Sequence, residues 1–545
     1  MMTQKFLGTW PTRRTFNDII CDLVFVVPRI DSRWFKCARW LQRKDSSIVR
    51  VSLHDWFTLS EGGEYFIGVA VVLMDFIRRI NPGVRRRSRD QIETELYNIP
   101  LFITKSKDLL KNEPLVTVEG PDFIGYICDA ADEDIFASTL LNATRMKTVF
   151  NSRRGCFRFD YLGEKNMSLC TDVEITRRQD ATNTIIAVNS SEIIKVYRRL
   201  NKGLSPDIEM NRVLNSTGFP NIPNPLGYAV YSEDQGSVYP VFFIQEYLKN
   251  EGDVWSLLYK DASEFFKKKW SSISAGKMAY TDLADCTAYG SRRRENYLGV
   301  VTAGLHRASS NVGRKDFLPE PMEFCDVKGL IHNIALAISI TTEELERVDL
   351  CKELSEQKEI AFKSLRKIKE VFKSSGELGM KIRIHGDLHL GQFLQVKRND
   401  VYDFMIIDFE GEPLRPLHER IQKSSPLRDV AGMLRSFNYL GYSAAFNADN
   451  SPIKDESFVI AVKEWIKQAG EGFLGGYLKE INKSDRHLIP PDTYILRLLL
   501  LCFKLEKALY EVRYELRTRP RWINIALRGA LDSINEIQLN SSCKK

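Results

Sequence analysis

The chain has 545 residues, of which 43% are hydrophobic and 27% are charged, and its formal net charge is +7. Its length allows roughly three or four domain-sized units, and its composition is that of an ordinary water-soluble globular protein. The longest apolar runs, 66–74 and 496–503, fall well short of the roughly 20 residues that a membrane helix needs, and the N-terminal segment lacks the apolar core of a signal peptide. We therefore expect a cytoplasmic protein with no membrane partner.

The spacing of the cysteines and the surroundings of the basic runs exclude further classes of protein. The ten cysteines are scattered and form no C-x-x-C pair, which argues against a disulfide scaffold and against a zinc ribbon. Two basic runs, 83–90 and 291–296, lack interleaved aromatic residues and any recognisable nucleic-acid-binding module. We interpret them as solvated loops and expect no nucleic-acid partner.

The N-terminal half is rich in strand-like patterns. The first ~115 residues combine the strand-like runs 48–53 and 64–73 with a basic loop, so they are predicted to be α+β. Further on, an Asn-Ser-Ser turn signal separates two short apolar runs, 185–188 and 192–197. This arrangement predicts a β-hairpin.

Helical signals follow the predicted hairpin. A helix is expected between Ser205, a candidate N-cap, and Gly218, a candidate stop, with Pro206 suited to the first turn. Residues 238–248 form another apolar strand-like run. Beyond about residue 250 helical periodicity dominates, and the segment 497–517 is predicted to be a long helix.

One of these C-terminal helices shows its buried face in the sequence. The segment 359–372 places Ile360, Leu365, Ile368 and Phe372 on one stripe, as helical periodicity requires. An amphipathic helix that packs this stripe against a core is therefore expected.

The stretch RIHGDLHLGQ, residues 383–392, combines two histidines, an aspartate and a glutamine. His385 and His389 have the i, i+4 spacing of a zinc-binding helix, but Gly386 stands where that motif requires a glutamate. A zinc site is therefore a weak hypothesis.

The same stretch has the spacing of a phosphoryl-transfer loop. In protein kinases H-R-D-x-x-x-x-N is followed by a hairpin and then by D-F-G. Here Asp387 is followed after four residues by Gln392, then by a predicted hairpin with its turn at 397–400, and then by a D-F-E-G sequence that begins at Asp408. Asp387 is the candidate catalytic residue because it can take or orient the proton of the attacking hydroxyl. Gln392 and Asp408 supply the oxygen ligands that Mg²⁺ prefers, and the alternative is a polar turn beside a strand end.

Nucleotide-binding residues are sought upstream. A kinase needs a strand lysine for the α- and β-phosphates and a helical glutamate that holds this lysine. No glycine-rich loop of either common pattern is present, so a polar turn at 180–184 is expected to cover the phosphates. Residues 245–248 are expected to offer backbone groups to adenine. The candidate ATP-binding residues are Lys195, Glu209, Thr182, Asn183, Thr184, Gln245, Glu246, Tyr247 and Leu248.

Several segments give the sequence a family resemblance. It resembles the maltokinases, in the aminoglycoside-phosphotransferase-like branch of the kinase fold. The metal-loop motif indicates only the wider kinase branch, whereas the C-terminal pattern K-A-L-Y-E-V-R-Y-E with R-P-R-W points to maltose. The segments that carry the resemblance are 383–392, 406–416, 425–437 and 507–522, supported by 198–209, 218–223 and, for the cap subdomain, 39–48.

The C-terminal pattern also has a helical interpretation. Lys507, Tyr510, Glu511 and Tyr514 follow i, i+3, i+4, i+7 and share one helix face. A solvated amphipathic face explains this periodicity equally well, but aromatic faces suit sugar rings, and Lys and Glu can hydrogen-bond hydroxyl groups. With the resemblance, the candidate sugar-binding residues are Lys507, Tyr510, Glu511, Tyr514, Arg519 and Trp522.

The resemblance implies a bilobal, protein-kinase-like α+β fold, with a cap subdomain at 1–125, an N-lobe at 126–250 and a mainly helical C-lobe at 251–545. It implies structural roles for His385 and Asp429, with Asp429 bracing the catalytic loop. The implied activity is the Mg²⁺- and ATP-dependent phosphorylation of maltose to maltose 1-phosphate for α-glucan (glycogen) synthesis. Trehalose synthase is a candidate partner.

The sequence also departs from the family. The chain is longer than expected, with extra sequence near 260–325 and in the N-terminal part, and the stretch 260–296 could reshape the sugar entrance. A kinase for another sugar, such as glucosamine, is a close rival, and a catalytically silent pseudokinase that binds sugar or partners is a rival from another class. The presence of Lys195, Asp387, Gln392 and Asp408 argues against the pseudokinase.

Overall fold

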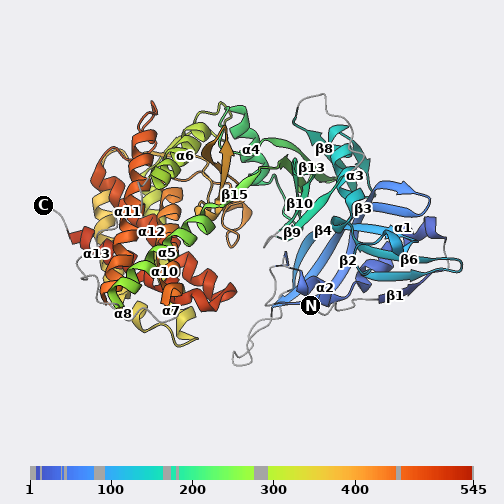
Figure 1. Ribbon diagram of the computed structural model, residues 1–545, viewed down its shortest axis with the longest axis horizontal. Helices are drawn as coiled ribbons and strands as arrows, with labels where there is room; N and C mark the ends of the chain where they lie inside the picture. The colour runs from blue at the N-terminus through green and yellow to red at the C-terminus, as the bar shows by residue number, and fades with distance from the viewer. Residues whose placement is uncertain are drawn as a thin grey trace. The chain divides into compact units, whose positions relative to one another are not determined.

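The chain divides into two compact units (Figure 1), the first formed by residues 1–209 and 223–249 and the second by residues 210–222 and 250–545. Among the sequence features above, the basic run 83–90 and Thr182 lie outside the described residues. The computed structural model describes residues 8–12, 15–38, 40–41, 46–78, 92–163, 173–179, 183–274, 293–449 and 456–542.

The first unit begins with a largely antiparallel sheet. Its strand order is β1-β5-β6-β4-β3-β2, β1 runs parallel to β5, and a short strand pairs with β4. Two short helices, α1 (Ile19–Val26) and α2 (Ser32–Cys37), accompany it. The strands are β1 (Gly8–Pro11), β2 (Ser46–Gly62), β3 (Tyr65–Arg78), β4 (Ile92–Thr104), β5 (Val116–Glu119), β6 (Ile124–Asp129) and β12 (Arg199–Leu200).

The unbroken apolar run in β3 has a simple cause. Alternate side chains of a strand point to opposite faces of its sheet. Ile67 and Val69 pack into one hydrophobic cluster of the first unit, whereas Ala70 and Val72 pack into another. Both faces of β3 are therefore buried, which is why the run does not alternate with polar residues.

A second, antiparallel sheet of the first unit has the order β7-β8-β13-β14-β11-β10-β9. Helix α3 (Asp134–Arg145) packs Phe136 and Leu140 into the same cluster as this sheet. The predicted hairpin is confirmed, because β10 and β11 pair in antiparallel register. The strands are β7 (Val149–Asn151), β8 (Gly155–Tyr161), β9 (Ile175–Gln179), β10 (Asn183–Val188), β11 (Glu192–Tyr197), β13 (Pro225–Glu233) and β14 (Val238–Glu246).

The expected boundary at residue 125 is wrong in position. Residues 124–129 form the single strand β6, which pairs with β4 and β5 of the first sheet. A strand that is bonded on both sides cannot contain a domain boundary. The chain changes from one sheet to the other only after this strand, within the same compact unit.

The second unit is mainly helical (Figure 1) and has one large apolar core. Helix α12 is buried almost all round at Leu498–Leu501, as its continuous leucine run requires. The predicted stripe of α8 buries Leu365, Ile368 and Phe372. The helices are α4 (Pro206–Ser216, whose first turn belongs to the first unit), α5 (Val254–Ser274), α6 (Arg293–Ser310), α7 (Phe324–Glu346), α8 (Lys352–Lys373), α9 (Leu417–Arg420), α10 (Leu427–Asp449), α11 (Glu456–Ile481), α12 (Thr493–Thr518) and α13 (Ile523–Ser542).

A small sheet of the second unit carries the predicted metal loop. Its order is β15 (Asn250–Asp253), β18 (Phe393–Arg398) and β19 (Val401–Ile406), and β18 and β19 pair as an antiparallel hairpin. Asn399 and Asp400 form its turn with φ of 48° and 62°, the left-handed conformation that two-residue hairpin turns require. The hairpin predicted from the sequence is confirmed.

One described helix, α7, is long and apolar enough to cross a membrane by length and composition, with a mean hydropathy of 1.3 over its most apolar window. Its residues Val327, Ile334, Ile338 and Leu345 lie in the core of the second unit.

Candidate active site

The loop that contains Asp387 is fixed by a buried carboxylate at the start of α10. Asp429 accepts hydrogen bonds from the backbone N–H of His385 at 2.8 Å and of Gly386 at 2.9 Å. Gly386 has a φ of +82°, which favours glycine. A Cβ on Gly432 would lie 2.5 Å from the carbonyl oxygen of Leu388, so α10 approaches the loop at backbone distance. These contacts are of the kind that the bracing role expected of Asp429 requires.

His385 is buried beneath the same loop. Its Nε2 lies 3.0 Å from the carbonyl oxygen of Ile407, and its Nδ1 accepts the backbone N–H of Asp387 at 3.3 Å. Nε2 therefore carries the proton and donates to Ile407. The ring also packs against Phe409, with 4.8 Å between centroids. His385 thus ties the loop of Asp387 to the end of the hairpin, and no zinc ligation is needed to explain it.

Gln392 and Asp408 meet at the base of the hairpin. The amide nitrogen of Gln392 donates to a carboxylate oxygen of Asp408 at 3.3 Å, and the backbone N–H of Ile407 donates to the carbonyl oxygen of Gln392 at 3.0 Å. Asp408 has a φ of +67°, which is uncommon for a residue with a side chain. Strained positions of this kind cluster at functional sites.

These oxygen donors fit a magnesium ion. Carboxylate oxygens of Asp408 and Glu410 lie within 4.8 Å of each other, and the amide oxygen of Gln392 is not used in its bond to Asp408. Mg²⁺ is a hard ion that prefers oxygen ligands. Sequence reasoning missed Glu410, although its place two residues after Asp408 was visible.

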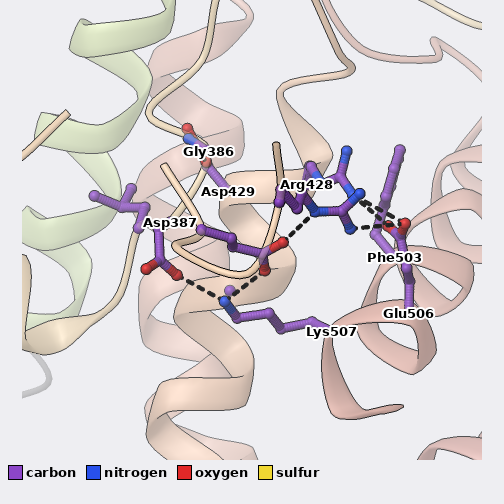
Figure 2. A pocket seen from close by; sticks show the side chains of 11 residues that line it. Gly386, Asp387, Arg428, Asp429, Phe503, Glu506 and Lys507 are labelled. Atoms are coloured by element: carbon purple, nitrogen blue, oxygen red, sulfur yellow. Dashed lines mark hydrogen bonds and ion pairs between the residues drawn. The ribbon is translucent and has the colours of Figure 1, made fainter. Parts of the chain in front are cut away.

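Asp387 is paired with a lysine from α12. The ammonium nitrogen of Lys507 lies 2.7 Å from Oδ1 of Asp387 and 2.7 Å from Oε1 of Glu412 (Figure 2). Both carboxylate oxygens and the ammonium belong to largely buried side chains, with 19%, 4% and 16% of the side chain exposed for Asp387, Glu412 and Lys507. Lys507 therefore holds the candidate catalytic carboxylate directly.

The ion pairs continue away from Asp387. The guanidinium of Arg415 pairs with the carboxylates of Glu412 and Glu506, the latter at 3.1 Å. Arg428 donates to both oxygens of Glu506 at 2.9 Å. Together with Asp387 and Lys507, these residues form a row of three carboxylates and three cations in alternation. We call this row the ion-pair chain, and its formal charge is zero.

The ion-pair chain keeps its buried groups charged. Burial alone would raise the pKa of Glu412, but the positive charges of Lys507, Arg415 and Arg428 lower it to about 2. Burial alone would lower the pKa of Lys507, but Asp387 and Glu412 raise it well above its ordinary value. Both groups are therefore ionised across the physiological pH range.

The ion-pair chain also fills the hollow in which it lies. The space left among its side chains, Phe503 and the Asp387 loop is about 10 Å³ (Figure 2), which is close to the minimum for a single water molecule. A sugar ring cannot enter this space. The hollow supports Asp387 and does not itself bind the acceptor.

A larger hollow of about 340 Å³ lies elsewhere on the second unit, and Arg307, Lys483 and Arg486 contribute to its lining. Arg307 and Lys483 both pair with Glu480, at 2.5 and 2.6 Å, and Arg486 donates to the carbonyl oxygen of Ser310. One carboxylate, that of Glu480, therefore pairs with two of these three cations, and none of the candidate site residues lines this hollow.

Part of the predicted sugar-binding stripe of α12 makes contacts within the protein itself. The rings of Tyr510 and Tyr514 are stacked, with centroids 6.3 Å apart and an interplanar angle of 18°. Glu511 accepts two hydrogen bonds from Arg435 of α10, at 2.7 and 3.0 Å. The half-buried tyrosine pair offers an aromatic surface, whereas Glu511 and Lys507 are already engaged in ion pairs.

Arg519 and Trp522 continue the aromatic surface. The Arg519 guanidinium lies 5.7 Å from the ring centroid of Tyr514 and 6.0 Å from that of Trp522. Trp522 stacks on Tyr439 of α10, with 5.9 Å between centroids. The guanidinium of Arg519 also pairs with Glu515 at 2.5 Å. The structure therefore brings four of the six predicted sugar residues, Tyr510, Tyr514, Arg519 and Trp522, into one continuous surface.

In the first unit, Lys195 lies on β11 as predicted. Its ammonium nitrogen is 2.9 Å from a carboxylate oxygen of Asp207 in the first turn of α4. Sequence reasoning chose Glu209, two residues further along the same helix, and missed Asp207, although both acidic residues were visible there. The role of Glu209 stays a prediction.

For two of the residues predicted to cover the phosphates, the predicted turn is wrong. Asn183 and Thr184 lie in strand β10 and not in a turn, and both are buried. The hydroxyl oxygen of Thr184 accepts a hydrogen bond from the fully buried Arg198 at 2.9 Å. Pairing with β9 and β11 holds Thr184 in the sheet, so its side chain cannot reach a phosphate.

The predicted adenine segment begins at the end of β14, which pairs with β11, the strand of Lys195. The backbone N–H of Glu246 donates to Asn224 at 2.9 Å, and that of Tyr247 donates to Ser191 at 2.8 Å. These two N–H groups are therefore unavailable to a nucleotide base, which corrects part of the prediction. The roles of Gln245 and Leu248 stay predictions.

Comparison with solved structures shows the class of fold to which the chain belongs. The chain has the α+β fold of kinase-like phosphotransferases, with a sheet-rich part and a helical part. A crystal structure of glucosamine kinase in complex with glucosamine, ADP and inorganic phosphate aligns with 88% of this chain and 93% of that chain, with a TM-score of 0.57 and 19% identity. Another crystal form of glucosamine kinase gives a TM-score of 0.56 at 18% identity, over 88% of this chain and 91% of that chain.

Curated relatives agree with this class. The chain is 25% identical over 363 residues to the glucosamine kinase of Mycolicibacterium smegmatis (strain ATCC 700084 / mc(2)155), which covers 65% of this chain and 78% of that protein. It is 24% identical over 364 residues to the glucosamine kinase of Streptacidiphilus jiangxiensis, which covers 66% of this chain and 72% of that protein. No protein-family model matches the chain. These relatives are not maltokinases, so maltokinase membership stays a prediction.

Proposed function

We propose that the protein is an ATP-dependent sugar kinase. The observation that carries this proposal is the contact between Gln392 and Asp408 at the base of one hairpin, to which His385 ties the loop whose Asp387 is held by the buried ammonium of Lys507. A structural ion pair would not require the adjacent oxygen ligands, and a pseudokinase would not need to keep them. The relatedness to glucosamine kinases supports the same reaction class.

In the proposed reaction, a sugar hydroxyl oxygen attacks the γ-phosphorus of ATP, the bond from this phosphorus to the β–γ bridging oxygen breaks, and ADP leaves. Asp387 orients the attacking hydroxyl and accepts its proton. A magnesium ion held by Gln392, Asp408 and Glu410 would neutralise phosphate charge. Lys507 fixes the Asp387 carboxylate, and Lys195 is the candidate ligand of the α- and β-phosphates. Such chemistry depends mainly on positioning and charge stabilisation.

Glucosamine is the acceptor that the comparisons favour, because both curated relatives are named for it. Maltose is the second candidate. It is favoured by the aromatic surface of Tyr510, Tyr514 and Trp522, which offers more than one aromatic ring to a sugar of two rings. The maltokinase-like pattern at 507–522 also favours it. With maltose, the product would be maltose 1-phosphate for α-glucan synthesis, and a partnership with trehalose synthase stays a prediction. A cytoplasmic location, expected from the sequence, would suit either reaction.

A sugar panel tests the proposal. ADP release from Mg·ATP is followed with glucosamine, maltose, glucose, trehalose and no sugar, and magnesium is then replaced by EDTA. We expect a sugar-dependent rate that needs magnesium and is highest with glucosamine. A rate that is the same with and without every sugar would overturn the sugar-kinase proposal. A rate that is highest with maltose would make maltose, the second candidate, the proposed acceptor.

A further inference from the structure

The outward side of helix α8 is a continuous row of charged side chains. The helix packs against α7 and α13 and buries Leu354, Ala361 and Phe372 in the core of the second unit. Successive residues of a helix are rotated by about 100°, so six residues of α8 lie within about 40° of the direction opposite Ala361. All six are exposed and charged, and we call them the α8 face: Lys352, Glu356, Glu359, Lys363, Arg366 and Glu370.

The signs of the α8 face follow a specific pattern. Along the chain they are plus, minus, minus, plus, plus and minus. Reading the row in the opposite direction inverts every sign. Two identical rows that run side by side in opposite directions therefore place opposite charges against each other along their whole length. Two rows that run in the same direction and in register would place like charges together.

Stabilisation of the single helix does not explain this pattern. The helix dipole favours acidic residues in the first turn and basic residues in the last turn, but the two central glutamates and the two central cations of the face lie between these turns. Three pairs of opposite charge have the i, i+4 spacing at which side chains of one helix can pair. In the part of the chain that the structure describes, however, none of the six side chains forms an ion pair.

The composition of the face limits the kind of partner. Among the described residues, none of the exposed large hydrophobic side chains lies on α8, so the face lacks the apolar residues with which a surface helix enters a membrane. It has three cations and three carboxylates, so a polyanion such as a nucleic acid would meet carboxylates as well as cations. A complementary surface has to carry both signs in the reverse order, and a second copy of the α8 face does so.

We propose that a second copy of this chain docks on the α8 face, with the two α8 helices antiparallel about a two-fold axis at the level of Ala361. The acidic centre of the face, Glu356 and Glu359, then lies opposite the basic centre of the second copy. By symmetry the basic centre, Lys363 and Arg366, lies opposite the acidic centre of that copy, so each contact occurs twice. The proposal goes beyond the kinase function and does not depend on it.

The contact should be weak and sensitive to salt. Helix α8 has 22 residues and is therefore about 33 Å long. The contact of one such helix with its copy is smaller than a standard stable interface. Exposed ion pairs contribute little one by one and are screened by salt. Charge complementarity of this kind mainly sets orientation and register, so we expect a reversible dimer whose population depends on concentration.

Sedimentation velocity of the full chain at increasing concentration provides the first test. At low ionic strength the average mass should rise from the 62.7 kDa of one chain toward twice that mass, and at high ionic strength it should fall back. A mass that stays at that of one chain at every concentration overturns the proposal and leaves the face solvated or open to another partner. A dimer that salt does not weaken also overturns it, because an interface built from charges is screened.

Two charge-block variants test the face itself. Glu356→Lys with Glu359→Lys makes both centres of the face basic, and Lys363→Glu with Arg366→Glu makes both acidic. Each variant alone should self-associate more weakly by roughly tenfold or more, because like charges then oppose each other across the two-fold axis. An equimolar mixture of the two variants should dimerise again. Such recovery cannot arise within one helix, since the complementary charges are on different chains.

Glu264→Lys with Glu471→Lys is the matched control, because it makes the same change of net charge at two exposed residues of α5 and α11. This control should associate like wild type, and equal weakening in it overturns the proposal. Unchanged association of a charge-block variant, or a mixture of two folded variants that stays monomeric, also overturns it. The salt dependence of wild type needs no variant, so it decides the proposal even if a charge-block variant does not fold.

Discussion

The ammonium nitrogen of Lys507 lies 2.7 Å from Asp387, a residue 120 positions earlier in the chain. The same nitrogen lies 2.7 Å from Glu412, so one cation pairs with two carboxylates. An aspartate that acts in phosphoryl transfer has to stay ionised and point in one direction while other negative charges approach. The pairing with Lys507 holds the Asp387 carboxylate in one direction and connects the candidate catalytic residue to the helix that also carries the tyrosine pair.

The first prediction concerns Asp387. Asp387→Asn should leave the protein folded and able to bind nucleotide but nearly inactive, because an amide cannot accept the hydroxyl proton. Turnover, thermal unfolding and ADP binding are measured on the same preparation. Asp261→Asn is the control, since Asp261 is exposed and, among the residues that the structure describes, forms its ion pair with Arg294. Near-normal turnover in a folded Asp387→Asn protein would remove this residue from the mechanism.

The second prediction separates metal and phosphate roles. Asp408→Ala should abolish magnesium-supported turnover, because it removes a carboxylate ligand at the base of the hairpin. Lys195→Ala should mainly weaken the productive placement of ATP, which appears as a higher KM for ATP together with a lower rate. Titrations of magnesium and ATP against each variant distinguish the two effects. The assignment of Asp408 fails if Asp408→Ala keeps the rate and metal dependence of wild type.

The third prediction concerns the acceptor. Tyr514→Ala removes one ring of the stacked pair with Tyr510, and losing such contacts costs on the order of 1–3 kcal/mol where a buried polar group is left unpaired. This corresponds to a roughly tenfold to hundredfold loss of kcat/KM for the sugar, with the ATP dependence little changed. Tyr494→Ala, near the other end of α12, is the control. A loss confined to the ATP dependence would contradict a sugar-facing role.

The fourth prediction follows from the pKa of Glu412, which is lowered from 4.5 to about 2. A carboxyl whose pKa falls on folding stabilises the folded state above its unfolded pKa and loses this contribution as the pH falls through its folded pKa. Glu412→Gln should therefore destabilise the protein at pH 7 by on the order of a few kcal/mol. The difference from wild type should shrink between about pH 4.5 and pH 2.

Urea unfolding of both proteins across this pH range measures the effect. Glu419→Gln is the control, because Glu419 also pairs with Arg415 but is 41% exposed, and exposed pairs contribute little. A destabilisation of Glu412→Gln that does not change with pH would show that packing, and not the charge of Glu412, is responsible.

Local features were predictable from the sequence. The β18–β19 hairpin follows from a turn signal between two apolar runs. The helical conformation of α12 follows from its periodicity. Such patterns place Asp387, Gln392 and Asp408 relative to one another because all three lie within one loop and hairpin. The short sequence distance limits how far apart they can be.

Long-range partners were not predictable. Periodicity assigned Lys507 to a helix face but could not say that Asp387 and Glu412, 120 and 95 residues away, would meet it. Thr184 is buried because β10 already begins at Asn183, and this start depends on pairing with the two neighbouring strands β9 and β11.

The most direct test of the central claim is ³¹P NMR of a reaction that contains Mg·ATP and glucosamine or maltose, run with wild type and with Asp387→Asn. The account predicts that a sugar-phosphate signal and ADP appear together and in equal amounts with wild type, and that neither appears with folded, nucleotide-binding Asp387→Asn. Formation of ADP and free phosphate without a sugar phosphate, or an equal yield of sugar phosphate from both proteins, would contradict it.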